Sequence, residues 1–265
     1  METILYIVIA VAVVVLLLFL IFTSYKKPKV RAILPLQYVA LLEANVPFYK
    51  TLDDGKKKEF CNRVQAFLSE VKITGVKTEV EDLDRVLVAA SAIIPIFGFP
   101  EWEYINVNEV LIYPDSFNHD FEQKGADRNI LGVVGEGAYE DLMILSQHEL
   151  RQGFLNKSGK TNTAIHEFVH LIDKTDGSTD GIPESILERQ YVLPWLNLVQ
   201  RQMKQILANR SDIDPYGATN QAEFLAVVAE YFFERPDLLQ NKHPQLYELL
   251  AKIFQQRPGA GSSKD

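Results

Sequence analysis

Two histidines with three residues between them are the clearest chemical feature of this chain. They lie in the run His166-Glu167-Phe168-Val169-His170, whose apolar neighbours are typical of a buried helix. On a helix, positions i and i+4 share one face, so both imidazoles can bind one tetrahedral Zn²⁺. Glu167 lies beside them, where its carboxylate can act as general base towards a water at the metal. The alternative is two histidines placed by chance on a core helix, but the motif and its helical context together favour a metal site.

A catalytic zinc site also needs a third protein ligand and one open position for water. Glu223, in the first turn of an expected helix, is a candidate, although Asn220 and Glu223 are also spaced as a capping box. Glu230, two turns later on the same face, is the main alternative, and Glu184 and Glu188 are weaker ones. The spacing alone leaves the third ligand open.

Asp173 comes three residues after His170 on the same helical face. It can therefore accept a hydrogen bond from the second ring nitrogen of a ligating histidine, unless it caps the helix end or is exposed. His119 and His243 have no such partner pattern, and we expect them at the surface.

His148 and Glu149 do not form a second metal motif, because residue 152 is Gln. They come directly after an expected strand, Leu142 to Ser146, which could lie beside the cleft as an edge that pairs with substrate.

The periodicity of apolar residues predicts several further elements. The helix with the histidines should begin near Thr161 to Thr163 and stop at Gly177, which can adopt a left-handed conformation. The other expected helices run from Asp53 or Asp54 to Val71, from Asp82 to Ile94, from Pro183 or Glu184 to Asn209, from Asn220 to just before Pro236, and from Pro244 to Gln256; the other expected strands are Val107 to Tyr113 and Ile130 to Val134.

The composition is that of a globular protein. Hydrophobic residues make up 47% of the 265 residues and charged residues 23%, so we expect the chain to be mainly folded rather than disordered. The net charge of −8 argues against a nucleic-acid partner. Cys61 is the only cysteine, which excludes a disulfide within the chain and a cysteine-based zinc site, and it is compatible with a reducing compartment.

The run from Ile4 to Phe22 contains 19 consecutive residues without a charge. As a helix it would cover close to the ~30 Å hydrocarbon core of a bilayer. A signal peptide is the alternative, but the start carries Glu2 and no small-residue cleavage site comes after the run. Four basic residues lie between positions 26 and 31 and none precedes the run, so the positive-inside bias places the rest of the chain in the cytoplasm. We expect a single-pass anchor over residues 1–25 in the cell membrane, with the catalytic part facing the cytoplasm.

Three stretches together resemble a known family. They are the run from His166 to Asp173, the strand Val110 to Pro114, and the block from Tyr216 to Phe233. They resemble the Mlc titration factor A family of zinc metallopeptidases, peptidase family M90, and the resemblance extends from about Ile33 to Pro258. The catalytic domain of anthrax lethal factor is similar from Tyr216 to Ala226.

The resemblance implies roles that spacing leaves open. In both relatives the position matching Glu223 is the third zinc ligand, which favours Glu223 over Glu230. In lethal factor the tyrosine matching Tyr216 faces the metal and stabilises the oxyanion of the tetrahedral intermediate, a role that suits a neutral phenol donor. The alternative for Tyr216 is packing at the turn before the helix. The expected site is one Zn²⁺ per chain on His166, His170 and Glu223, with Glu167 and Tyr216 as catalytic residues.

The resemblance also implies an α+β architecture. We expect a zincin-like catalytic domain over residues 98–258, with a small mixed sheet, the active-site helix and C-terminal helices. A helical N-terminal domain is expected over residues 26–97, after the transmembrane helix, and a flexible tail over residues 259–265. Pro95, Gly98 and Pro100 mark the boundary between the two domains.

The implied activity is hydrolysis of a peptide or protein substrate, of the aminopeptidase type found in characterised family members. The family also includes proteins that bind a glucose-responsive transcriptional repressor called Mlc. The alternative function is therefore a membrane-tethered binding protein for a transcriptional regulator, with peptidase activity secondary. Because the N-terminal span departs from the soluble family members, a substrate close to the membrane is a further alternative.

Overall fold

The computed structural model describes residues 33–116, 132–134, 141–156 and 158–259. From Ile33 onward the chain forms one compact unit. The span expected from Ile4 to Phe22 lies outside the described residues, and among those that are described no helix is both long and apolar enough to cross a bilayer.

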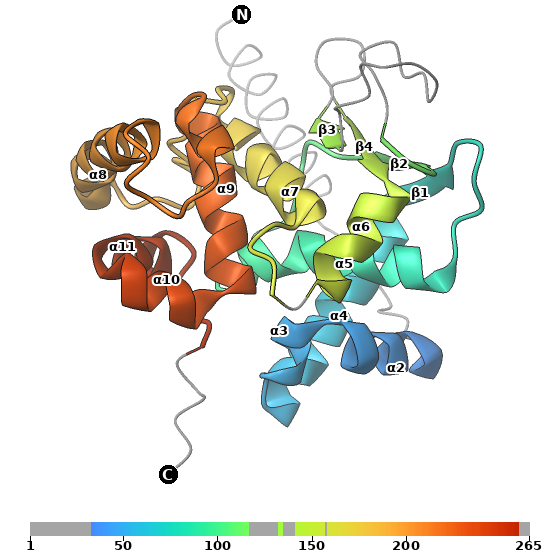
Figure 1. The fold of residues 1–265 in the computed structure, drawn as a ribbon. Coiled ribbons are helices and arrows are strands. Elements are labelled where there is room, and N and C mark those ends of the chain that lie inside the picture. Colours follow the sequence, from blue (N-terminus) through green and yellow to red (C-terminus); the bar gives the residue numbers. More distant parts are fainter. Residues whose placement is uncertain (1–32, 117–131, 135–140, 157, 260–265) are drawn as a thin grey trace, which may run out of the picture. The chain divides into compact units, whose positions relative to one another are not determined.

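A small mixed sheet lies on one side of this unit (Figure 1). Strands β1 (Lys72–Gly75), β2 (Glu109–Tyr113) and β4 (Leu142–Ser146) are parallel, and β3 (Gly132–Val134) pairs antiparallel with β4. The strand order is β1-β2-β4-β3. The predicted mixed sheet is confirmed, but the suggestion that Leu142–Ser146 is a pairing edge is wrong, because β3 covers that side of β4 and takes the outer position.

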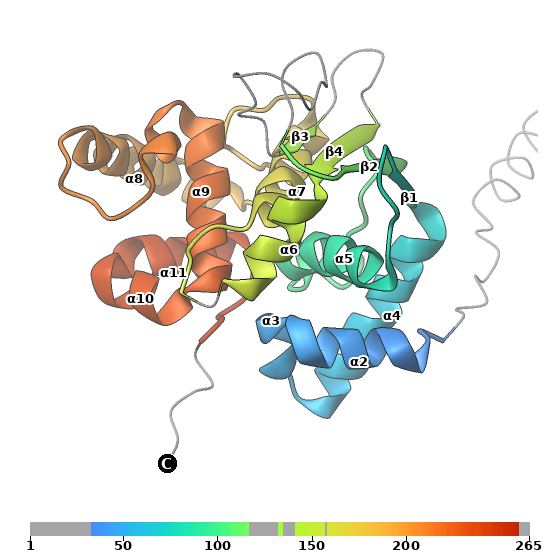
Figure 2. The ribbon, with the colours of Figure 1, turned by 45° about the vertical axis from the view of Figure 1, so that its right-hand side comes forward.

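The helices surround a central one. Figures 1 and 2 show α7 between the sheet and α9, with α5 running beneath α7. Helices α8, α10 and α11 pack around α9, whereas α2 and α4 pack on α5. In chain order the helices are α2 (Leu36–Asn45), α3 (Pro47–Lys50), α4 (Asp54–Glu70), α5 (Asp82–Ile96), α6 (Gln147–Leu155), α7 (Thr163–Asp173), α8 (Arg189–Leu207), α9 (Gln221–Glu234), α10 (Pro236–Lys242) and α11 (Pro244–Ile253), with short 3₁₀ turns η2 (Lys174–Asp176) and η3 (Pro215–Ala218).

Helix α7 is fixed at both ends and along its length. The Asn162 side chain caps its start by accepting a hydrogen bond from the Ile165 amide at 3.2 Å. Its apolar residues are buried on all sides, and the Phe168 ring lies 5.7 Å from that of Phe67 and 5.2 Å from that of Tyr104. Gly177, with a φ of 97°, ends the 3₁₀ turn that comes after the helix. A helix held in this way can present its polar side chains rigidly.

Helix α8 begins later than the sequence predicts. The expected start is Pro183 or Glu184, whereas the helix begins at Arg189. The amides of Ile186 and Leu187 both donate to the carbonyl of Pro183, at 3.0 and 2.9 Å, so this segment forms a turn with two buried side chains. The sequence analysis misses β1, α2, α3, α6 and α10, whereas the remaining predicted helices agree with the structure to within a few residues.

One hydrophobic core runs through the whole described unit. Phe48, in α3, packs against Phe97 after α5 and against Phe233 in α9, with ring centroids 5.8 and 6.3 Å apart. The residues expected to form a helical part and those expected to form a catalytic part therefore share a single core.

Candidate metal centre

Helices α7 and α9 bring the three predicted metal ligands together. Nε2 of His166 lies 3.1 Å from Nε2 of His170 and 3.0 Å from Oε2 of Glu223. The same glutamate oxygen is 3.4 Å from Nε2 of His170. Within the described residues, this is the group of histidine and carboxylate side chains whose ligand atoms converge closely enough to hold a metal ion. The alternatives Glu184 and Glu188 are exposed and take no part in it.

The spacing of these donor atoms fits zinc. Zinc lies about 2.0–2.2 Å from imidazole nitrogen or carboxylate oxygen, which puts the donors of a tetrahedral site about 3.4 Å apart. The three distances between the donor atoms here are 3.0, 3.1 and 3.4 Å. Two imidazoles and one carboxylate also form a ligand set typical of catalytic zinc, with a fourth position left for water.

Glu230 orients one of the histidines rather than serving as a ligand. Its Oε1 lies 2.7 Å from Nδ1 of His166, and its Oε2 accepts a hydrogen bond from the Asn162 amide at 2.5 Å. An ionised carboxylate can only accept, so Nδ1 carries a hydrogen and Nε2 is the ring nitrogen that faces Glu223 and His170. The two-turn spacing from Glu223 predicted the correct helix face for Glu230, but not this role.

Opposite charges hold His166 and Glu223 together. Burial disfavours the charged form of His166, but its hydrogen bonds to Glu223 and Glu230 outweigh this and raise its pKa to about 10. Burial likewise opposes ionisation of Glu223, yet hydrogen bonds from His166 and His170 bring the pKa of that carboxyl well below its usual range. The site therefore favours a positive charge between these side chains, and a metal ion can replace the proton there.

Glu167 comes directly after the first histidine and is only 7% exposed. Burial raises the pKa of its carboxyl, and the neighbouring histidines partly offset this effect. A raised pKa makes the carboxylate a stronger base, which suits a residue that takes a proton from water and later passes it on.

Tyr216 lies at the open side of the site and is 54% exposed. Its ring centroid is 6.0 Å from that of His166, and its amide donates a hydrogen bond to Oδ1 of Asp214 at 2.9 Å. Burial and the negative charges of Glu223 and Glu167 raise the pKa of the phenol, so it keeps its proton as a hydrogen-bond donor. The structure thus places the predicted catalytic tyrosine beside the ligands.

Asp173 does not form the predicted hydrogen bond to a histidine ring. Its Oδ2 accepts from the Gly181 amide at 2.8 Å and so holds the chain after α7. Its Oδ1 and Nδ1 of His170 are both buried without a hydrogen-bond partner among the described residues. Burial raises the pKa of this carboxyl to about 6. His148 is exposed on α6 and is not among the converging ligand residues, and His119 lies outside the described residues.

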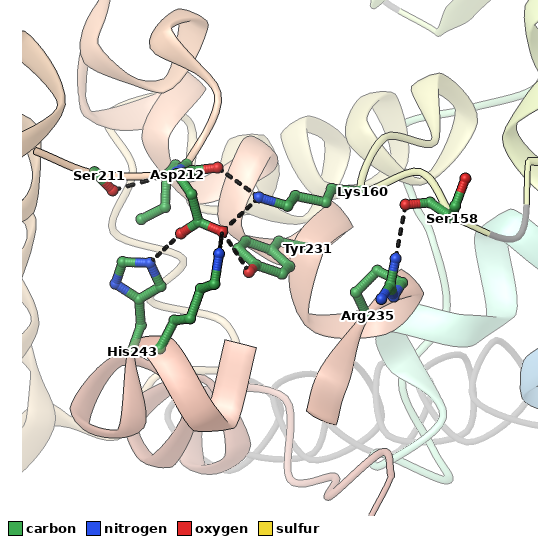
Figure 3. A network of polar contacts seen from close by, with 9 residues as sticks. Ser158, Lys160, Ser211, Asp212, Tyr231, Arg235 and His243 are labelled. Atoms are coloured by element: carbon green, nitrogen blue, oxygen red, sulfur yellow. Dashed lines mark hydrogen bonds and ion pairs between the residues drawn. The ribbon is translucent and has the colours of Figure 1, made fainter. Parts of the chain in front are cut away.

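A second polar network centres on Asp212 (Figure 3). Its carboxylate accepts hydrogen bonds from Lys160 at 2.6 Å, from Lys242 at 2.9 Å and from the Tyr231 hydroxyl at 2.9 Å. These donors outweigh the effect of burial and bring the pKa of Asp212 well below its usual range.

His243 belongs to the same network, with Nε2 2.7 Å from Oδ1 of Asp212 and a side chain only 11% exposed. The surface position predicted for His243 is therefore wrong, because a carboxylate distant in sequence covers it. The network connects the segment before Tyr216 to the loop before α7 through Lys160 and to α9 through Tyr231. Helices α7 and α9 are the two that carry the predicted ligands.

Known proteins are similar to this chain over most of its length. The sequence profile of the glucose-regulated metallo-peptidase M90 family matches residues 22–255. An uncharacterized protein from Synechocystis is 29% identical over 234 residues, which cover 83% of this chain and 84% of that protein. Mlc titration factor A from Escherichia coli is 25% identical over 232 residues, covering 81% and 84%. The resemblance to peptidase family M90 is confirmed, and the chain belongs to the glucose-regulated metallo-peptidase M90 family.

Proposed function

We propose that this chain is a zinc-dependent peptidase that hydrolyses peptide bonds with a metal-activated water. The observation that carries this proposal is the convergence of His166, His170 and Glu223, whose donor atoms lie 3.0 to 3.4 Å apart. Glu167 is buried in the same helix, next to the ligand pair. Membership of a metallo-peptidase family supports the same reaction class.

The residues of the site divide the work of hydrolysis. When bound, zinc polarises the scissile carbonyl and lowers the pKa of a water molecule towards about 7. Glu167 takes the proton of the attacking water and then delivers it to the leaving amine. Tyr216 donates a hydrogen bond to the developing oxyanion and keeps its proton. Glu230 keeps the hydrogen of His166 on Nδ1, so that Nε2 remains available to the metal.

The proposal extends to substrate and location. We infer aminopeptidase-type cleavage from the resemblance to characterised family members. The apolar run from Ile4 to Phe22 and the basic residues after it support a single-pass anchor in the cell membrane, with the catalytic part on the cytoplasmic side. A substrate could pair with β3, because this strand lies at the edge of the sheet that contacts α7.

The name of a relative favours a second candidate function. Mlc titration factor A is named for an action on Mlc, and it matches most of this chain. A regulator-binding role would survive loss of catalysis, so a Glu167→Gln variant should still capture a soluble regulator protein under this alternative. Retained binding with normal affinity would support it, whereas no complex with a candidate regulator would oppose it.

The decisive test of the peptidase proposal uses the full-length protein and two variants. Glu167→Gln should keep one zinc per chain and lose cleavage by about 10²-fold or more, because the general base is gone. His166→Ala should lose both zinc and cleavage. Metal content is measured by elemental analysis, and cleavage with aminoacyl p-nitroanilides and internally quenched peptides. Full zinc occupancy in His166→Ala would overturn the site, and full activity in Glu167→Gln would overturn the mechanism. Internal cuts without N-terminal trimming would refute the aminopeptidase assignment.

A further inference from the structure

One glycine of the edge strand lies directly against the proposed general base. A Cβ atom built on Gly132 would lie 2.7 Å from Cγ of Glu167 and 2.8 Å from its Oε1. The next nearest atom, at 3.0 Å, is the carboxyl carbon of the same residue. The three closest contacts of such a methyl group would therefore all be with Glu167.

The backbones on both sides are fixed, so the Glu167 side chain is the part that would have to move. Gly132 pairs with Leu145 of β4, so the antiparallel ladder holds its backbone. Glu167 projects from α7, which is capped by Asn162 and held in the core by Phe168. An ordinary contact begins at about 3.4 Å, so an added methyl group would have to displace the Glu167 side chain by about 0.7 Å or more. Gly132 is not among the glycines with positive φ, so the constraint here is space and not backbone conformation.

We propose that Gly132 is a positioning residue for catalysis: its missing side chain lets the edge strand lie against Glu167 and thereby sets the distance of that carboxylate from the metal site. The inference rests on the proposed role of Glu167 as general base. It explains why the strand nearest to α7 begins with a residue that is otherwise unfavourable in a strand.

The test is Gly132→Ala in the full-length protein. A displacement approaching 1 Å can cost about 10²-fold in rate, so we expect kcat to fall by roughly that factor, with KM and zinc content unchanged. Gly55→Ala is the matched control, because its Cβ would meet only the exposed Asp53 side chain, at 3.3 Å. This control should keep full activity.

A double-mutant cycle separates positioning from general damage. Gly132→Ala should lower the thermal stability of the otherwise wild-type chain but not that of Glu167→Ala, in which the clashing atoms are gone. Equal destabilisation in both backgrounds, loss of zinc in Gly132→Ala, or a kcat within twofold of wild type would each overturn the inference. If Gly132→Ala is fully active and Glu167→Gln is inactive, the peptidase proposal stands but the role of Gly132 is refuted. A fully active Glu167→Gln refutes both the peptidase mechanism and the role of Gly132.

Discussion

Glu230 offers a sharp test of how the metal site is organised, through the substitution Glu230→Gln. The carboxylate accepts two hydrogen bonds, one from Nδ1 of His166 at 2.7 Å and one from the Asn162 amide at 2.5 Å. A glutamine of the same shape has only one acceptor oxygen. If that oxygen faces His166, the new amide group points its hydrogens at the Asn162 N–H. If it faces Asn162, the His166 ring must move its hydrogen to Nε2, which can then no longer bind a metal.

Either arrangement weakens the metal site. Loss of a hydrogen bond to a charged group costs about 1.5–3 kcal/mol, and loss of a partner behind a metal ligand typically lowers metal affinity by about 10–100-fold. Removing the charge also lowers the pKa of His166 from about 10, which eases displacement of its proton. The same charge attracts a dication more strongly than a single proton, however, so the net effect remains weaker binding.

The measurement is the zinc dissociation constant, obtained by competition with a chelator of known affinity. We expect it to rise by about 10–100-fold, equivalent to about 1.4–2.8 kcal/mol. Glu234→Gln is the matched control: Glu234 lies one turn later on α9 and contacts the Asn162 side chain at 2.9 Å rather than a histidine. Burial raises the pKa of Glu234 to about 7, so replacing this carboxyl with a neutral amide should change its surroundings little. Equal zinc affinities for wild type and Glu230→Gln would refute the orienting role.

Three further perturbations test the site and its surroundings. Tyr216→Phe should lower kcat by roughly 10²-fold, because an oxyanion donor is lost. Zinc content and melting temperature should not change, because the side chain is half exposed. An unchanged kcat would contradict the catalytic role of Tyr216. Removing zinc with a chelator should lower the melting temperature, and about 100 Kd of added zinc should restore about 2.7 kcal/mol; a metal-independent melting curve would count against the site. Asp212→Asn should reduce the free energy of unfolding by about 2 kcal/mol, less than for a fully buried pair because Lys242 is half exposed. The pKa of Asp212 is depressed in the folded protein. The stability that Asp212 adds is therefore present above its unfolded pKa of about 3.9 and is lost as the pH falls through the folded value. A difference in unfolding free energy between wild type and Asp212→Asn that is the same at pH 2 and pH 7 would contradict this.

Local spacing was enough to predict the helix that carries the histidine pair. His166 and His170 are four residues apart, and the helical repeat alone puts them on one face. The helix region begins after Asn162 and ends at Gly177, as expected, because helix caps depend on residues close by in the sequence. Glu223 needed the family resemblance, since its distance in sequence from α7 is set by tertiary structure.

The features that sequence reasoning missed depend on contacts between distant segments. Nothing near His243 in the sequence indicates that Asp212 will cover it. Gly132 stands out only when β3 is seen against α7. Strand β1 was not predicted because only one of its four residues, Ile73, is buried, which leaves almost no alternating pattern to detect. Each of these features depends on tertiary contacts, which the local sequence does not reveal.

The division of the ligands between α7 and α9 has a consequence for biosynthesis. A chain leaving the ribosome exposes His166, Glu167 and His170 well before Glu223 has been made. Until α9 emerges, the early helix has two of its three ligands and lacks the Glu230 carboxylate that sets the His166 ring. Metal capture is therefore a late event, coupled to packing of α9 on α7. Under the proposed function, an unfinished chain lacks the complete site, so hydrolysis must wait until α9 has packed on α7.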